Sequence, residues 1–327
     1  MSYRSILMQA WRTTWNNKYL WFFGLFAVLL GNNGGLEALF KLVTQDGDGG
    51  FFVGVRRYAE TGIFSKAAMG NFGRFIVEDP LSFIILLTVF LIFIVLGVFL
   101  FWLSVVSQAA LVNNSARAET GKEHDFKRGM EIGMKKFWPV FSLNVVFKIV
   151  ISFIVILVGF PAMLSVGRLG LTISNLIFVL LFVIFVPVVI GLSFLMRYAV
   201  CYVVIKDQKI KEALKNAWKL LVANWLISLE MALALMLINF LVSLAIVLIF
   251  LLLAIPILFI AFMFAKLTFL FIFWLVIVCS LLAFFFLIVL SGALLATFQT
   301  SGWTSLFVQL NGMGGKSKLA RMFGKKN

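Results

Sequence analysis

The chain has 327 residues, of which 63% are hydrophobic and only 13% are charged. Soluble domains carry about 25% charged residues, so a mean hydropathy of +1.09 excludes a water-soluble globular protein. One histidine and thirteen acidic residues leave little material for acid–base catalysis or metal binding. We therefore expect an integral membrane protein that is not an enzyme and that uses no metal and no cofactor.

The net charge of +15 arises from 28 basic residues that flank long apolar segments. Basic residues next to membrane spans attract the anionic lipids of the cytoplasmic leaflet. We therefore expect the partner to be anionic lipid headgroups and not nucleic acid. Both cysteines, Cys201 and Cys279, lie in apolar stretches without metal-ligand spacing, and we interpret them as small hydrophobic residues.

Charge-poor segments predict the membrane-spanning helices, because a helix needs about 20 apolar residues to cross the hydrocarbon core. Such segments lie at 80–116, 137–164 and 171–205, the last with Pro187 as an expected kink. The apolar run 221–300 is too long for one helix. We divide it at Pro256 into spans near 221–254 and 257–297, the second starting loosely around Lys266.

The first predicted span, residues 19–30, is short and follows the basic residues Arg4, Arg12 and Lys18. A cleaved secretory signal is the alternative, but it needs a small-residue cleavage site. The following Gly-Asn-Asn-Gly-Gly at 31–35 does not fit one. We therefore favour a retained span and predict an all-α polytopic protein with six transmembrane helices.

The distribution of basic residues predicts the orientation of these spans. The segments 1–18, 113–136, 206–219 and 311–327 together carry 19 Lys and Arg, whereas 32–80, 165–170 and 254–266 carry 7. By the positive-inside rule, both termini face the cytoplasm from a cell membrane. The long Gly-rich segment 32–80 is then an external insertion.

Three segments, at 3–14, 126–137 and 210–221, share one amphipathic pattern at offsets of 84 and 207 residues. In each, apolar or small residues recur at the helical spacing i, i+3, i+4, i+7, i+8 and i+11. Two basic positions coincide in all three and are the predicted headgroup ligands: Arg4, Arg12, Lys127, Lys135, Lys211 and Lys219. Basic amphipathic helices of this kind lie in the headgroup region.

Each amphipathic segment leads directly into apolar sequence, which predicts a repeated unit of one interfacial helix and one transmembrane hairpin. Within a single membrane domain, 1–327, the repeat units are 1–120 with its external insertion 32–80, then 121–208 and 209–300. Residues 301–327 form a basic cytoplasmic tail. The repeats are parallel, since each contains an even number of spans.

The juxtamembrane segments, residues 126–139 and 197–225 with the helix EALKNAWKLLVANW, resemble those of a bacterial multi-span family. That family includes the membrane domain of glycerophosphodiester phosphodiesterase and related membrane proteins of unknown function. There the hydrolase is a separate soluble barrel, and no part of this sequence resembles one. The resemblance, over about residues 100–300, therefore implies an architecture in the bacterial inner membrane and not phosphodiesterase activity.

Polar residues inside the predicted spans form the second candidate site. Lys148, Arg197 and Glu230 fall at similar depth on the cytoplasmic side, and Asn144 and Gln108 could join them. Intramembrane charges are costly and normally pair inside the bundle. A structural ion pair, a binding or transport site, and snorkelling of Lys148 or Arg197 are the alternatives.

Two functions remain open. The first is a non-enzymatic lipid-handling or scaffold module that binds anionic headgroups at the cytoplasmic face. The alternative is a small-solute transporter that uses the intramembrane Lys148, Arg197 and Glu230. We interpret His124 as part of a solvated helix start, with Asp125 as its N-cap, rather than as a catalytic base.

Overall fold

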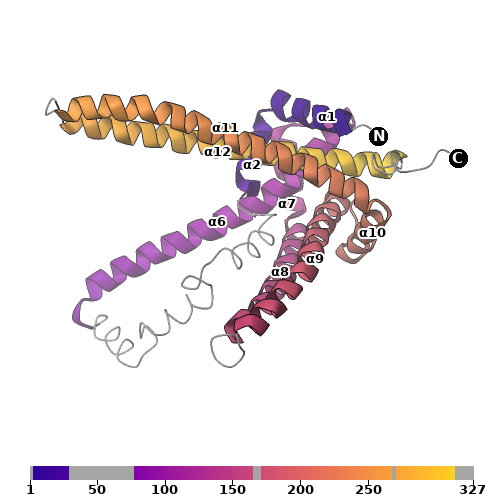
Figure 1. The fold of residues 1–327 in the computed structure, drawn as a ribbon. Coiled ribbons are helices and arrows are strands. Elements are labelled where there is room, and N and C mark those ends of the chain that lie inside the picture. The colour runs from indigo at the N-terminus through magenta and orange to yellow at the C-terminus, as the bar shows by residue number, and fades with distance from the viewer. Residues whose placement is uncertain (1–2, 29–76, 165–170, 267–269, 314–327) are drawn as a thin grey trace. The chain divides into compact units, whose positions relative to one another are not determined.

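The computed structural model describes residues 3–28, 77–164, 171–266 and 270–313, and all regular structure within them is α-helical (Figure 1). Five of the described helices are long and apolar enough to cross a membrane. The predicted fold class, an all-α polytopic membrane protein, is confirmed. The helices are α1 (Tyr3–Asn16), α2 (Tyr19–Val28), α6 (Pro80–Glu119), α7 (Phe126–Lys135), α8 (Phe137–Leu164), α9 (Leu171–Ile205), α10 (Ile210–Ala223), α11 (Trp225–Lys266) and α12 (Leu270–Met313).

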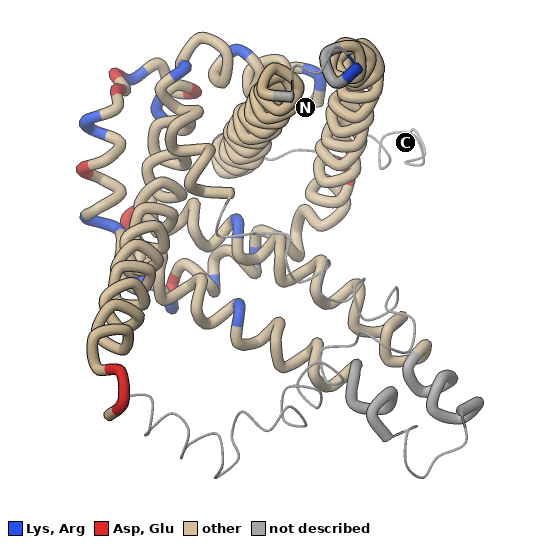
Figure 2. Tube along the Cα trace, turned by 90° about the vertical axis from the view of Figure 1, so that its left-hand side faces the viewer, with Lys and Arg blue, Asp and Glu red and all other residues tan. Residues whose placement is uncertain are grey.

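Long parts of these helices carry no charge and expose large apolar side chains. In Figure 2 they are the uninterrupted tan stretches of the tube. On α6, nearly every large apolar residue between Leu81 and Phe99 is exposed, whereas Leu103 to Ala116 is buried. An exposed apolar surface of this extent suits lipid and not water.

The helix α2 begins at Tyr19, where the first predicted span begins, and is described to Val28. Its 10 residues extend only about 15 Å, half of the hydrocarbon core. Leu20 and Phe23 are fully buried and pack against Ala110 and Leu111 of α6. Residues 29–30, the end of the predicted span, lie outside the described residues, and whether the chain crosses the membrane here stays a prediction.

Two predicted boundaries in the C-terminal part of the chain are wrong. Pro256 does not end a helix, because α11 continues through it to Lys266. A proline is tolerated in a membrane helix when its surroundings satisfy the freed backbone groups. The predicted tail also begins too early. Residues 301–313 belong to α12, and Trp303, Leu306 and Phe307 are buried there. The rest of the tail, and the insertion 32–80 up to residue 76, lie outside the described residues.

The chain divides into two compact units, which do not follow the boundaries of the predicted repeats. The first comprises residues 1–30, 104–141 and 197–327, and the second comprises 31–103 and 142–196. In the second, α8 packs on α9 through Ile154, Val158 and Val189. In the first, α11 and α12 lie side by side (Figure 1), with Met231 against Gly302 and Phe250 against Phe284, an antiparallel order.

Glycines determine how closely the short helices of the first unit approach the long ones. On α7, a Cβ at Gly133 would lie 2.5 Å from the carbonyl oxygen of Val106, and one at Gly129 would lie 2.4 Å from the Asn114 side chain. On α2, a Cβ at Gly24 would lie 2.4 Å from the carbonyl oxygen of Ala293. Only glycine therefore allows these helices to pack at their present distance.

The bends that follow α7 and α9 are joined by an ion pair. Lys136, where α7 ends and α8 begins, donates to the carboxylate of Asp207, which lies between α9 and α10. The lysine lowers the pKa of Asp207, an exposed residue in the left-handed region at φ +55. Aspartate tolerates this conformation better than most residues, so the turn and the ion pair use the same side chain.

We expect the substitution Gly133→Ala to lower the thermal unfolding temperature in detergent, because the added methyl collides with a backbone oxygen. Forcing extra atoms into a packed contact costs about 1–3 kcal/mol. The matched control is Gly97→Ala, since a Cβ at Gly97 meets nothing within 4 Å. Equal unfolding temperatures for the two variants would contradict the close approach of α7 to α6.

Candidate headgroup-binding surface

The three predicted amphipathic segments are the helices α1, α7 and α10, and all belong to the first unit. In each helix, the residues at positions i+3 and i+7 of the shared pattern are small or medium-sized and are buried in the protein. These buried residues are Ile6 and Ala10 of α1, Gly129 and Gly133 of α7, and Ala213 and Ala217 of α10. The three helices therefore share one burial pattern, and the repeat of whole units stays a prediction.

The six predicted headgroup ligands are all exposed: Arg4, Arg12, Lys127, Lys135, Lys211 and Lys219. Within each helix the two basic residues lie eight positions apart, which corresponds to about 12 Å along the axis. Each helix therefore presents two cations at its surface, at equivalent positions.

Next to the small buried residues, each helix exposes bulky apolar ones. The sequence pattern grouped both kinds on one face. Trp11, Met134 and Trp218 occupy equivalent positions and are 46%, 48% and 57% exposed. One turn later, Trp15, Trp138 and Val222 are also exposed, and Trp138 reaches 70%. The pattern placed Trp11 and Trp218 on the same apolar face as Ala10 and Ala217, and the structure separates them, because the alanines are buried and the tryptophans are exposed. Tryptophans beside basic residues are typical of the membrane interface.

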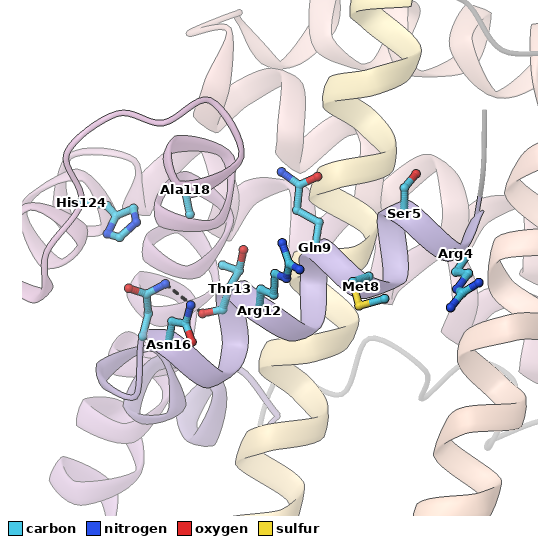
Figure 3. Close-up of a pocket in the computed structure, with 10 residues that line it drawn as sticks. Arg4, Ser5, Met8, Gln9, Arg12, Thr13, Asn16, Ala118 and His124 are labelled. Carbon is cyan, nitrogen blue, oxygen red and sulfur yellow. Dashed lines mark hydrogen bonds between the residues drawn. The ribbon is translucent and has the colours of Figure 1, made fainter.

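A groove runs along the polar face of α1 (Figure 3). Its volume is about 860 Å³, and Arg4, Gln9, Arg12 and Thr13 line it from α1. Opposite them lie Ala118, near the end of α6, and His124. None of the described residues that line this groove is acidic, so its electrostatic character is cationic. We refer to it as the α1 groove.

Both walls of the α1 groove are tied to the start of α2. The Trp21 indole donates to the carbonyl oxygen of Thr14, 2.8 Å away on α1. The Tyr19 hydroxyl lies 3.1 Å from Nδ1 of His124, on the opposite wall. The groove is therefore held open by fixed contacts. The hydrogen bond to Tyr19 gives His124 a structural partner. Our interpretation of His124 as part of a solvated helix start did not include this contact.

Asp125 is the predicted N-cap of α7. Its carboxylate accepts a hydrogen bond from the backbone N–H of Arg128 at 2.8 Å. An N-cap carboxylate satisfies a free N–H and interacts favourably with the helix dipole. The predicted start of α7 is confirmed.

The structure divides the predicted intramembrane cluster between the two units. Gln108, Arg197 and Glu230 belong to the first, whereas Asn144 and Lys148 belong to the second. Gln108 and Asn144 are buried, but Lys148 is exposed on α8. Exposure on an apolar helix favours snorkelling, in which the long lysine stem carries the charge to the interface. A shared site for all five residues stays a prediction.

Arg197 lies within the packed part of the first unit. Its guanidinium carbon is 4.8 Å from the ring centre of Trp303 on α12, which is cation–π geometry. The next residue, Tyr198, shares a 2.7 Å hydrogen bond with Ser228 of α11, two residues before Glu230. Helices α9 and α11 are therefore in contact at the level of Arg197 and Glu230, as the predicted ion pair requires.

Among the residues that the structure describes, no group of three or more histidine, cysteine or acidic side chains could hold a metal ion. Cys201 is buried and Cys279 is exposed, and neither forms a disulfide. The interpretation of both cysteines as small hydrophobic residues stays a prediction.

No family model matches the chain, and neither a curated protein nor a solved structure is significantly similar to it. The resemblance to the membrane domain of glycerophosphodiester phosphodiesterase therefore stays an expectation from the juxtamembrane segments. The function has to be inferred from the surface of α1, α7 and α10.

We expect Arg197→Gln and Glu230→Gln each to lower the free energy of unfolding, because removal of one partner would leave the other charge unmatched within a predicted span. Both residues are half-buried, so the loss should not exceed about 3–5 kcal/mol, the cost for a fully buried pair. The double variant should lose less than the two single variants combined. Thermal unfolding of all four proteins in the same detergent measures the coupling. Strictly additive losses would show that the two residues do not interact.

Proposed function

We propose that this protein is a non-enzymatic lipid-handling or scaffold module that binds anionic lipid headgroups at the cytoplasmic face of a cell membrane. The observation that carries the proposal is the common surface of α1, α7 and α10. At equivalent positions, each helix buries a small residue, exposes a bulky apolar one and exposes two basic ones.

This combination has a direct physical meaning at a membrane surface. Transfer of the bulky apolar residues from water into the boundary between headgroups and acyl chains lowers the free energy. Each basic residue near an anionic leaflet contributes about 1 kcal/mol. Exposed tryptophans such as Trp11, Trp15 and Trp218 are unfavourable on a surface that faces only water. A fully embedded surface would disfavour the exposed basic residues.

The transporter alternative has less support. It requires Lys148 to face a polar site together with Arg197 and Glu230, and Lys148 is exposed on α8. In contrast, two of the predicted headgroup ligands, Arg4 and Arg12, line the same groove.

We expect replacement of any one basic pair by glutamine to reduce the anionic lipid that stays bound to the purified protein. The pairs are Arg4 with Arg12, Lys127 with Lys135, and Lys211 with Lys219. At low ionic strength, each pair should lose about 2 kcal/mol of attraction to phosphatidylglycerol over phosphatidylcholine, by the value of about 1 kcal/mol per residue. Native mass spectrometry of the retained lipid gives the ratio.

The matched control for these pairs is Arg56→Gln with Arg57→Gln, which removes the same charge from the predicted external segment. This control should retain as much anionic lipid as the unaltered chain. Retention that does not change in any of the three pair variants would eliminate the headgroup-binding function.

We expect both termini and all three amphipathic helices on the cytoplasmic side. Single cysteines at Arg4, Lys127 or Lys211, in a chain with Cys201→Ala and Cys279→Ser, should react with an impermeant maleimide only after the cells are permeabilised. A single cysteine at Gly62, in the predicted external segment, should react in intact cells. Reaction of the Lys211 position in intact cells would reverse the orientation of α10.

A further inference from the structure

The α1 groove holds its cations at two separate places. Figure 3 shows Arg4 at one end, and Arg12 further along α1 on the side toward His124. The two arginines lie eight residues apart on one helix, about 12 Å along its axis. Cations separated on a rigid helix match two separated anionic groups better than they match one.

The space between the two arginines is polar and contains no described carboxylate. On α1, Ser5 and Gln9 lie between the arginines and line the groove, and Thr13 and Asn16 line it beyond Arg12. Their amide and hydroxyl groups donate to and accept from hydroxyls. Two carboxylates flank His124 in sequence: Asp125 is committed to the N-cap of α7, and Glu123 is exposed and is not among the residues that line the groove. A volume of about 860 Å³ also exceeds what one phosphate group fills and is typical of sites for larger ligands.

Exposed apolar side chains accompany the groove along α1. Met8 lines it and is 45% exposed. Trp11 and Trp15 follow at i+3 and i+7 from Met8, are exposed, and stack on each other with ring centres 5.4 Å apart. A ligand in the groove therefore has apolar surface beside it, which suits the glycerol backbone and acyl chains of a lipid.

We propose that the α1 groove binds a lipid headgroup that carries two phosphate groups joined by a short hydroxylated linker, one phosphate at Arg4 and the other at Arg12. Arginine binds phosphate through two parallel hydrogen bonds, whereas lysine acts as a point charge. Basic pockets on the cytoplasmic side of membrane helices are suited to such headgroups. The inference rests on the proposed headgroup binding and names its preferred ligand.

The test compares cardiolipin, which has two phosphates joined by a glycerol, with phosphatidylglycerol of matched acyl chains. The full-length protein in nanodiscs receives both lipids at equal phosphate concentration, and native mass spectrometry counts the lipids that stay bound. Two linked phosphates that engage two sites together gain from effective concentration. We expect cardiolipin to be favoured at least about tenfold per phosphate.

Single variants identify the groove as the site. Arg4→Gln and Arg12→Gln should each reduce the cardiolipin preference almost to one, because either change leaves a single phosphate site. The matched controls are Lys211→Gln and Lys219→Gln, which remove one charge at the equivalent positions of α10. They should lower the total anionic lipid but keep the cardiolipin preference. All four residues are exposed, and an unchanged unfolding temperature verifies the fold.

The outcomes separate this inference from the proposed function. Retention of anionic lipid without a cardiolipin preference would overturn the two-phosphate site and leave headgroup binding intact. A cardiolipin preference that persists in both arginine variants would also overturn it, since the site would lie elsewhere. Loss of all anionic-lipid preference would remove both. Displacement of cardiolipin by an equal concentration of its water-soluble deacylated headgroup would overturn a membrane lipid as the occupant.

Discussion

The close approach of short helices to long ones is the constraint on which the proposed surface depends. A Cβ at Gly133 or Gly24 would collide with a backbone oxygen, so these positions fix the rotation of α7 and α2 about their own axes. Successive residues on a helix are rotated by about 100°. When the small residue faces the protein, its bulky successor must therefore turn away. Ala10, Gly133 and Ala217 are buried, and Trp11, Met134 and Trp218, which follow them, are exposed.

Three of the long helices extend well beyond the hydrocarbon core and need polar partners there. At 40, 42 and 44 residues, α6, α11 and α12 extend about 60 Å or more, roughly twice the hydrocarbon core. On α6 and α12 one half is apolar and exposed, and the other half is buried and rich in polar residues. Ser115 of α6 lies 2.9 Å from Ser301 of α12, and Glu119 accepts from Ser305. Polar groups removed from water need such internal partners.

Much of the fold was predictable because its signals are local. The apolar runs predicted the long helices, the coincident basic positions predicted α1, α7 and α10, and Asp125 predicted the start of α7. What the sequence could not resolve depends on tertiary contacts. The apolar stripe of α10 includes both Ala217 and Trp218, and only the packing against α10 decides that the alanine is buried. The end of α12 was mispredicted for the same reason, since Trp303, Leu306 and Phe307 are buried there. Pro256 was mispredicted because proline is a weaker helix breaker in a membrane helix than in a soluble one.

The α1 groove depends on contacts that no periodic pattern contains. Its two walls come from α1 and from the segment around His124, more than 100 residues away in the chain. Within that segment Gly121 has a φ of +66, and the Arg117 guanidinium donates to the carbonyl oxygen of Glu123 at 2.7 Å. These contacts fold the segment back on itself next to α6.

The short helix α2 then acts as the spacer between the walls. Trp21 holds α1 and Tyr19 holds His124, while Leu20, which lies between them in sequence, is buried against α6. The described part of α2 thus contacts both walls of the groove and also packs on α6 and α12. Because this framework exists before any ligand arrives, binding would not have to order the groove, and rigid sites of this kind lose less entropy on association. In the first unit, an apolar segment thus helps to build a polar site. The equivalent helix α10 leads directly into the long helix α11, so the described residues there include no such spacer.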